Sequence, residues 1–205
     1  LGAEGVAVAH FDNTADVALN RCQFIPGVDL SNPGQLKQQI ESWKLHGCLT
    51  NFVLSPGSYQ LILVEAPAVE QSELKEAIRW RVKDLVSYDI AEASVDYFHL
   101  PDDAYRGRNN MVYAVVMPLS LSDQIEAFVQ EVGLQLDAID IPELALMNLT
   151  AHHQPDSPLA VAWLCLQQPT SYINLVCEQS LYLTRSVEIP TGLLDADDEQ
   201  VMQQA

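Results

Sequence analysis

The segment "MVYAVVMPLSLSDQIEAFVQEVGLQLDAIDIPELALMNL", residues 111–149, decides the fold class. The spacing of its apolar residues predicts four elements in succession, which are a strand over 109–118, a helix over 120–133, a strand over 134–142 and a helix over 143–153. Ser122 is a candidate cap for the first helix, and Gly133 ends it. Because strands that alternate with helices are typical of α/β proteins, the segment predicts an α/β fold.

The alternation extends to both sides of this segment. On the N-terminal side the patterns predict a hairpin of strands 5–11 and 16–25, a helix over 33–46, strands over 48–56 and 59–67, a helix from a Ser72 cap to Val86, and a strand over 93–101. On the C-terminal side "QPDSP" (154–158) is a linker candidate, and three strands follow at 159–167, 171–178 and 181–189.

Two hairpins in the sequence are similar to each other. "VAVAHF…DVALNRCQFIPG" and "YINLVC…SLYLTRSVEIPTG" are both a strand, a tight turn and a longer strand that closes in Ile-Pro and Gly. If they are copies of one unit, the first copy should also have a strand before it, ahead of Leu1. A coincidence between two amphipathic hairpins is the alternative.

Charge and composition exclude several partner classes. The 205 residues include 10 basic and 28 acidic residues, a formal net charge of −18. Such a charge repels nucleic acid and anionic membranes, and it disfavours ATP unless a metal ion and local donors compensate. With 48% hydrophobic residues the chain can fold around a core. No apolar run is long enough to span a bilayer, so we expect no membrane insertion by this segment.

Three segments resemble PilM-type proteins of type IV pilus assembly, in the order of that family. In residues 73–100, "ELKEAIRWRVKDLVSYDIAEASVDYFHL", a helix with an Arg-Trp pair leads to a strand with Asp-Tyr. Residues 111–149 are similar to the family's strand–helix–strand–helix run, and "LYLTRSVEIPTG" (181–192) to its strand with an Arg. Within the family the resemblance is greatest to the PilM-like component of the mannose-sensitive haemagglutinin (MSHA) pilus system. The type II secretion protein GspL is a more distant relative.

The resemblance implies an actin-like fold, in which two ribonuclease H-like halves face each other across a nucleotide cleft and a small α+β subdomain is inserted in the first half. On this map residues 1–67 and 138–154 form the first half, 68–137 the insert, and 158–205 the start of an incomplete second half. Family members lie on the cytoplasmic side of the inner membrane and bind the tail of a PilN-like membrane protein, which is MshJ in the MSHA system. The pilus assembly ATPase is a further implied partner, and a homodimer is left open.

The resemblance also places two phosphate-binding turns. An actin-like site holds a phosphate against backbone N–H groups of two hairpin turns, with an Asp in each turn to hold Mg²⁺ through water. The first turn here is "LGAEG" (1–5), in which Gly2 and Gly5 are suitable but Glu4 is an acid of the wrong reach.

The second turn, "CLQQPTS" (165–171), departs further from the pattern. It has neither glycine nor acid, Pro169 has no N–H, and only Thr170 and Ser171 offer side-chain donors. We therefore expect a vestigial nucleotide site and no resident Mg-ATP. An ATP-binding switch that controls partner affinity is the alternative.

The helix predicted over 73–86 carries a candidate partner-binding stripe. Leu74, Ile78, Val82 and Leu85 form its predicted apolar face. Lys75, Arg79 and Lys83 follow at i, i+4 spacing on an adjacent stripe, beside Trp80. Trp and Arg are favoured in interface hot spots, so the stripe is a candidate docking site for an acidic or extended partner segment. A solvated face that pairs with the protein's own acids is the alternative.

The strands at 94–100 and 110–117 offer a second candidate surface. Tyr97 alternates with Asp96 along the first strand, and a free edge here could accept a peptide by strand addition. An internal sheet without a free edge is the alternative.

No residue set indicates catalysis. His152, His153 and Asp156 lack the same-face spacing of a structural metal site, and no nucleophile or carboxylate pair has a recognisable context. Cys22, Cys48, Cys165 and Cys177 lack CxxC spacing, so we expect buried, reduced thiols in a cytosolic protein. The sequence favours a non-catalytic scaffold, and an unrelated α/β binding domain is a third alternative.

Overall fold

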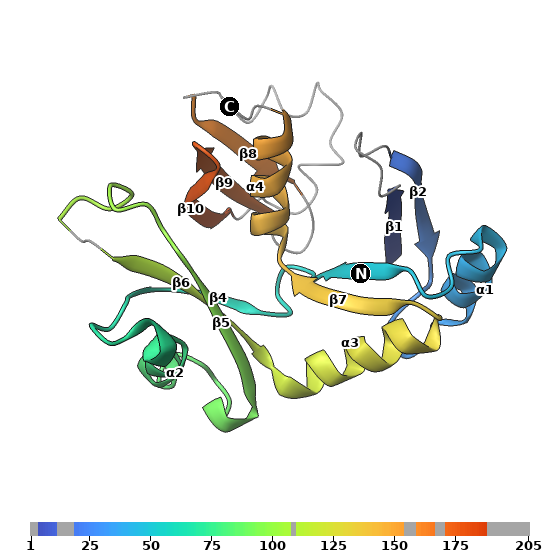
Figure 1. Cartoon of the computed structure of the whole chain (residues 1–205), viewed down its shortest axis with the longest axis horizontal. Helices are drawn as coiled ribbons and strands as arrows, with labels where there is room; N and C mark the ends of the chain where they lie inside the picture. The colour runs from blue at the N-terminus through green and yellow to red at the C-terminus, as the bar shows by residue number, and fades with distance from the viewer. Residues whose placement is uncertain (1–3, 12–18, 108–109, 154–158, 167–170, 188–205) are drawn as a thin grey trace, which may run out of the picture.

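The computed structural model describes residues 4–11, 19–107, 110–153, 159–166 and 171–187. Within these residues the chain is a mixed α/β protein with four helices and four small sheets (Figure 1). The predicted α/β class is confirmed.

The N-terminal hairpin and the first helix share one core. β1 (Gly5–Phe11) pairs antiparallel with β2 (Leu19–Pro26), as the sequence predicts. α1 (Gly34–Trp43) packs into the same apolar cluster. The helix ends before the predicted His46, because Lys44 adopts a left-handed conformation with φ of 60°.

A parallel strand pair carries the main core. β3 (Leu49–Val53) pairs in parallel with β7 (Gln135–Asp140), and α3 (Leu119–Glu131) runs alongside β7 (Figure 1). Gly133 follows α3 with φ of +86°, which confirms the predicted helix stop. The buried residues of this core and the hairpin are Val6, Ile25, Val28, Leu36, Ile40, Leu45, Leu54, Met117, Ile125, Phe128, Val129, Val132 and Ile141.

A three-stranded sheet lies within the long crossover from β3 to β7. Its strands are β4 (Gln60–Glu65), β5 (Ala93–His99) and β6 (Met111–Pro118), in the antiparallel order β4-β6-β5. β6 is an almost unbroken apolar run because it is the central strand and both of its faces are buried. α2 (Gln71–Val82) covers one face of this sheet, and a short 3₁₀ turn (Ile90–Glu92) leads into β5 (Figure 1).

The fourth sheet packs against the last helix. β8 (Val161–Cys165), β9 (Ser171–Cys177) and β10 (Ser180–Val187) are antiparallel in the order β10-β9-β8. α4 (Pro142–His153) lies beside this sheet (Figure 1), and Trp163 Nε1 donates a hydrogen bond to Thr150 Oγ1 at 2.6 Å.

Several local predictions are wrong. α2 ends at Val82 rather than at Val86, so Leu85 lies beyond the helix and is 57% exposed instead of completing the apolar face. Ser72 lies inside α2, whose N-cap is Glu70. Ser122 lies inside α3, where its hydroxyl donates to the Leu119 carbonyl.

Two further observations concern cysteines and the membrane. All four cysteines are free thiols, but Cys22 is exposed and the other three are half-buried, so the expectation of buried thiols is wrong for Cys22. No helix in the described part of the chain is both long and apolar enough to cross a bilayer.

Candidate functional site

The predicted basic stripe lies on the flank of α2 that faces β5. Leu74, Ile78 and Val82 are buried against the sheet, which fixes the rotation of the helix. With about 100° per residue, Lys75 and Arg79 then fall beside the edge of the sheet and not on its face. The side chains from Gln71 to Arg79 on this flank, together with Val95, Asp96 and Tyr97 of β5, form what we call the α2–β5 surface.

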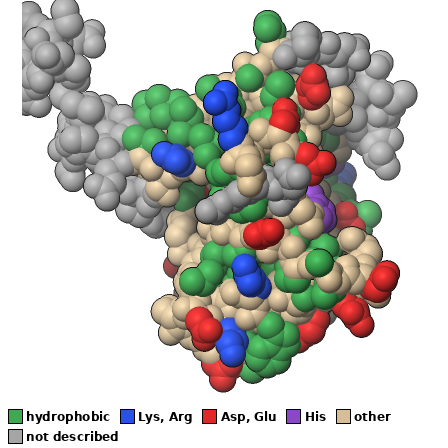
Figure 2. All heavy atoms as spheres, turned by 90° about the vertical axis from the view of Figure 1, so that its left-hand side faces the viewer, with side chains coloured by type: hydrophobic (Ala, Val, Ile, Leu, Met, Phe, Trp, Pro, Cys, Tyr) green, Lys and Arg blue, Asp and Glu red, His purple; other side chains and the backbone are tan. Residues whose placement is uncertain are grey.

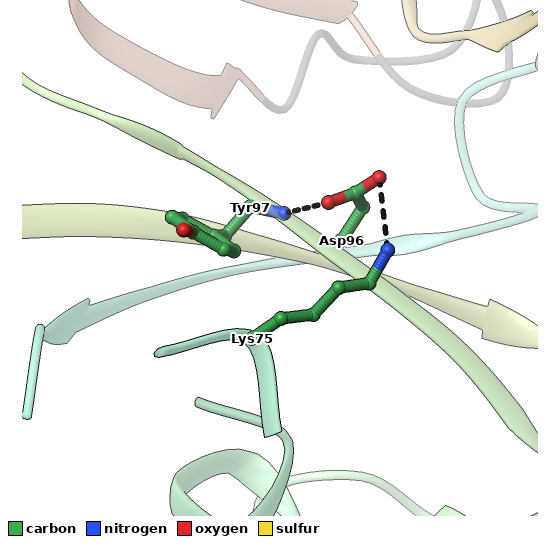
Figure 3. A network of polar contacts seen from close by, with 3 residues as sticks. All are labelled: Lys75, Asp96 and Tyr97. Carbon is green, nitrogen blue, oxygen red and sulfur yellow. Dashed lines mark hydrogen bonds and ion pairs between the residues drawn. The ribbon is translucent and has the colours of Figure 1, made fainter. Parts of the chain in front are cut away.

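Asp96 links this surface into one polar network (Figure 3). Lys75 Nζ lies 3.3 Å from Asp96 Oδ2, and Tyr97 N–H donates to Asp96 Oδ1 at 2.9 Å. The Lys75 and Asp96 side chains are 60% and 73% exposed. An ion pair this exposed adds at most about 1 kcal/mol to stability, so the network can open at little cost.

Arg79 and Gln71 complete the surface. The guanidinium of Arg79 donates to the carbonyl of Ile90, in the turn that leads into β5. Gln71 Nε2 and the Tyr97 hydroxyl are 3.0 Å apart. A shallow pocket of about 220 Å³ lies between helix and strand, and its lining residues are Ser72, Lys75, Glu76, Arg79 and Val95.

β5 has a free edge. In the order β4-β6-β5 no described strand pairs with the outer side of β5, whereas β6 is internal, so the alternative of an internal strand is wrong for β5. In an antiparallel ladder the N–H and C=O of one residue point to the same side, and alternate residues point to opposite sides. Because Tyr97 N–H bonds to Asp96 and not to β6, the backbone groups of Val95, Tyr97 and His99 point to the free edge.

The structure brings together only part of the predicted partner-binding set. Lys75, Arg79 and Tyr97 belong to the α2–β5 surface. Trp80 is 57% exposed and does not line the pocket, and Lys83 Nζ lies 5.6 Å from the centre of its ring in a cation–π contact. On the face shown in Figure 2, basic side chains are few and lie among acidic and apolar ones.

The structure describes three of the five predicted nucleotide-loop residues. Gly5 is buried at the start of β1, where a Cβ would meet the backbone of Ile25 and Pro26, so the hairpin itself requires glycine there. Glu4 is exposed, and its carbonyl accepts a hydrogen bond from Gly27 N–H at 2.9 Å. Ser171 is buried at the start of β9. Gly2 and Thr170 lie outside the described residues.

Sequence reasoning missed a buried polar junction between the sheets. The Tyr59 hydroxyl, in the loop before β4, donates to Glu143 Oε2 at 2.5 Å. Glu143 lies in the first turn of α4 and is only 7% exposed. Burial raises the pKa of its carboxyl, which the hydrogen bond from Tyr59 partly opposes, and burial also raises the pKa of Tyr59 and of nearby Tyr172 on β9. An acid at the start of the apolar helix "ELALMNL" was the one available signal.

A second buried polar group is Asn174, on the central strand β9. Its side chain is fully buried, and neither its amide oxygen nor its amide nitrogen has a hydrogen-bond partner among the described residues. Such a group destabilises the fold unless something pairs with it. His152 and His153, whose spacing does not indicate a metal site, end α4, and Asp156 lies outside the described residues.

Comparisons with solved structures show the fold. A protein in the solved structure "PilM-PilN type IV pilus biogenesis complex" matches 91% of the chain, with a TM-score of 0.74 and 15% identity, and the chain spans 59% of the length of that protein. The cytoplasmic domain of EpsL, an inner-membrane component of the type II secretion system of Vibrio cholerae, matches 96% of the chain with a TM-score of 0.59 and 12% identity. The chain spans 72% of that domain.

The name of a third similar structure gives the fold. A protein of unknown function from Bacteroides thetaiotaomicron with an actin-like ATPase fold matches 100% of the chain, which spans 72% of it, with a TM-score of 0.51 and 12% identity. The chain has an actin-like fold. At these identities the likeness extends to the fold alone. No protein-family model matches the sequence, and no curated protein matches it either.

Proposed function

We propose that the chain is a PilM-like, cytoplasmic scaffold of a type IV pilus assembly complex, and that it docks the cytoplasmic tail of a PilN-like inner-membrane protein. The likeness to the PilM–PilN complex over 91% of the chain supports this proposal most strongly. The segments 73–100, 111–149 and 181–192 add the sequence resemblance to the same family.

Within this family we propose that the chain corresponds to MshI of the MSHA pilus, with MshJ as the PilN-like partner. The pilus assembly ATPase and a second copy of the chain are further candidate partners. In the same assignment residues 1–67 and 138–154 form the first actin-like subdomain, 68–137 the insert and 158–205 the start of the second.

Charge supports a tail as the partner. Cytoplasmic segments next to a membrane span carry an excess of Lys and Arg, and this chain has a net charge of −18. Opposite charges speed association and make it sensitive to salt. The scaffold would therefore gain its partner through surface complementarity, without chemistry on a substrate.

We propose that the scaffold is non-catalytic and holds no nucleotide. Pro169 removes a backbone donor from the second turn, which offers neither glycine nor acid. The rival is an ATP-driven switch, which thermal unfolding distinguishes. A ligand present at 100 times its Kd should add about 2.7 kcal/mol to stability, so a shift of that size with Mg-ATP would favour the switch.

Isothermal titration with a synthetic peptide of the MshJ cytoplasmic tail tests the docking role. We expect binding that weakens as NaCl is raised, and no binding of a peptide with the same composition in scrambled order. A tail that binds no better than the scrambled peptide would contradict the proposal.

A further inference from the structure

The free edge of β5 combines three independent features. It presents the unpaired side of a strand, it adjoins a pocket, and it lies beside two cations, Lys75 and Arg79. An edge strand with outward backbone groups is a template for an added strand.

The two contacts of Asp96 at this edge are ones that a bound peptide strand would also form. One carboxylate oxygen accepts the hydrogen bond of Tyr97 N–H, the position that a carbonyl of an added strand would take. The other oxygen contacts Lys75 Nζ, the position that an acidic side chain of the same strand would take (Figure 3). Both side chains are largely exposed, so exchanging Asp96 for a partner's groups costs little.

The pocket gives the added strand a place for a side chain. Val95, which is 4% exposed, lines the pocket on the strand side, and its backbone N–H and C=O point to the free edge beside it. Ser72, Lys75, Glu76 and Arg79 of α2 line the pocket on the helix side. A residue paired across from Val95 would therefore bond to the backbone of β5 and lie beside Lys75 and Arg79, with Glu76 in the same lining.

Charge selects the occupant. Four of the ten basic residues of the chain are Lys75, Arg79, Arg81 and Lys83, although the whole chain has a net charge of −18. Glu76 and Asp96 balance Lys75 and Arg79 here, so the ion pair and not the net charge decides. When an added strand displaces Asp96, Lys75 loses the acid that pairs with it; an acidic side chain of the strand restores that ion pair, and a basic side chain does not.

We propose that the free edge of β5 binds an extended acidic peptide segment as an added strand, with Asp96 as an intramolecular competitor that the peptide displaces. The segment belongs to a partner other than the basic tail of the PilN-like protein. The chain would then join two partners through two separate surfaces.

Fluorescence anisotropy with a labelled peptide of sequence TDVEVDT, acetylated and amidated at its ends, tests the proposal. A peptide with Lys in place of each acid controls for charge, and a peptide N-methylated at alternate residues controls for main-chain pairing. We expect binding of the acidic peptide alone, weakened about tenfold or more by N-methylation, because added strands gain affinity from main-chain hydrogen bonds. Equal binding of the N-methylated peptide, or no binding at all, would overturn the proposal.

Substitutions at Asp96 give a result that a merely structural role does not predict. Asp96→Asn keeps an acceptor for Tyr97 N–H but loses the ion pair, and Asp96→Ala loses both. Affinity should therefore rise from the unaltered protein to Asp96→Asn and again to Asp96→Ala, by about two- to fivefold per step, the range of an exposed ion pair. Unchanged or weaker binding in both variants would overturn the role of Asp96.

A matched pair of variants tests the cation. Lys75→Gln should weaken binding about threefold or more, whereas Arg81→Gln should leave it unchanged. Arg81 undergoes the same change in charge, is exposed, and lies about 120° around α2 from Lys75. Circular dichroism confirms that each variant folds, and an equal effect of both substitutions would reduce the site to general electrostatics and overturn it.

Two further readouts assign the occupant. Light scattering would detect a dimer of the chain. A dimer that dissociates when the peptide is added would assign the edge of β5 to a second copy of the chain and overturn the proposal. Unlabelled MshJ tail should not displace the acidic peptide. Displacement of the acidic peptide by the tail would show that both bind one site, which would overturn this inference but not the docking role. A tail that fails to bind in the titration would overturn the docking role but not this site.

Discussion

Replacing Tyr59 by Phe removes the hydroxyl that donates to the buried carboxylate of Glu143 and keeps the ring. The two residues are 84 positions apart in the sequence and join the loop before β4 to the start of α4. Tyr172 of β9 is close enough to raise the pKa of Tyr59, so the sheet β10-β9-β8 adjoins the same junction. The substitution tests whether this contact holds parts of the fold together.

The expected loss follows from burial and charge. A hydrogen bond to a charged group contributes about 1.5–3 kcal/mol to stability, and Glu143 at 7% exposure cannot recover the lost donor from water. When Gln replaces Glu143, the same bond is between neutral groups and contributes about 0.5–1.5 kcal/mol. We therefore expect Tyr59→Phe to lower the free energy of unfolding by about 1 kcal/mol more in the unaltered protein than in the Glu143→Gln variant.

Urea unfolding followed by circular dichroism at pH 7 measures the four members of this cycle. Tyr88→Phe is the control, because burial raises the pKa of this tyrosine although no described residue forms a hydrogen bond with its hydroxyl. A loss below about 0.5 kcal/mol for Tyr59→Phe, the level of ordinary surface substitutions, would show that the hydroxyl does not stabilise the junction. An equal loss in both backgrounds would refute the charged character of the bond.

Three further predictions concern single residues. Because burial raises the pKa of the Glu143 carboxyl, its contribution to stability is complete below the unfolded pKa and is lost as pH rises through the folded pKa. The free energy of unfolding of Glu143→Gln should therefore rise relative to that of the unaltered protein between pH 4 and pH 7.5, and a constant difference would contradict this. Asn174→Val removes two unpaired buried groups and should raise the free energy of unfolding by about 1–3 kcal/mol; a loss would reveal a partner for the amide. Gly133→Ala should lower Tm, since φ is +86° and the new Cβ would meet the His46 ring at 2.9 Å, and an unchanged Tm would show that the turn can relax.

Periodicity predicted the order of the helices and strands because burial imposes it locally. The helix ends were less predictable. α1 ends at the left-handed Lys44, which no glycine marks, and α2 ends at Val82 although the apolar spacing continues to Leu85. A stretch can keep helical spacing after its helix has ended, since tertiary contacts decide where the hydrogen bonds stop.

Strand pairing and the site depend on contacts that the sequence does not encode locally. The alternation along β5 places Asp96 on the other face of the sheet from Val95, away from α2. Lys75 of α2 still reaches Asp96 because β5 is at the edge of the sheet. The choice of β5 as edge and β6 as centre follows from the assembled sheet. The unbroken apolar run of β6 indicates that both of its faces are buried. It does not indicate which strand pairs with each of its two edges.

Titration calorimetry with the PilN-like tail, with and without Mg-ATP, decides between the scaffold and the nucleotide switch. We expect the tail to bind with the same Kd in both conditions. A tail that binds only when Mg-ATP is present would identify a nucleotide switch, and a tail that never binds would remove the docking role.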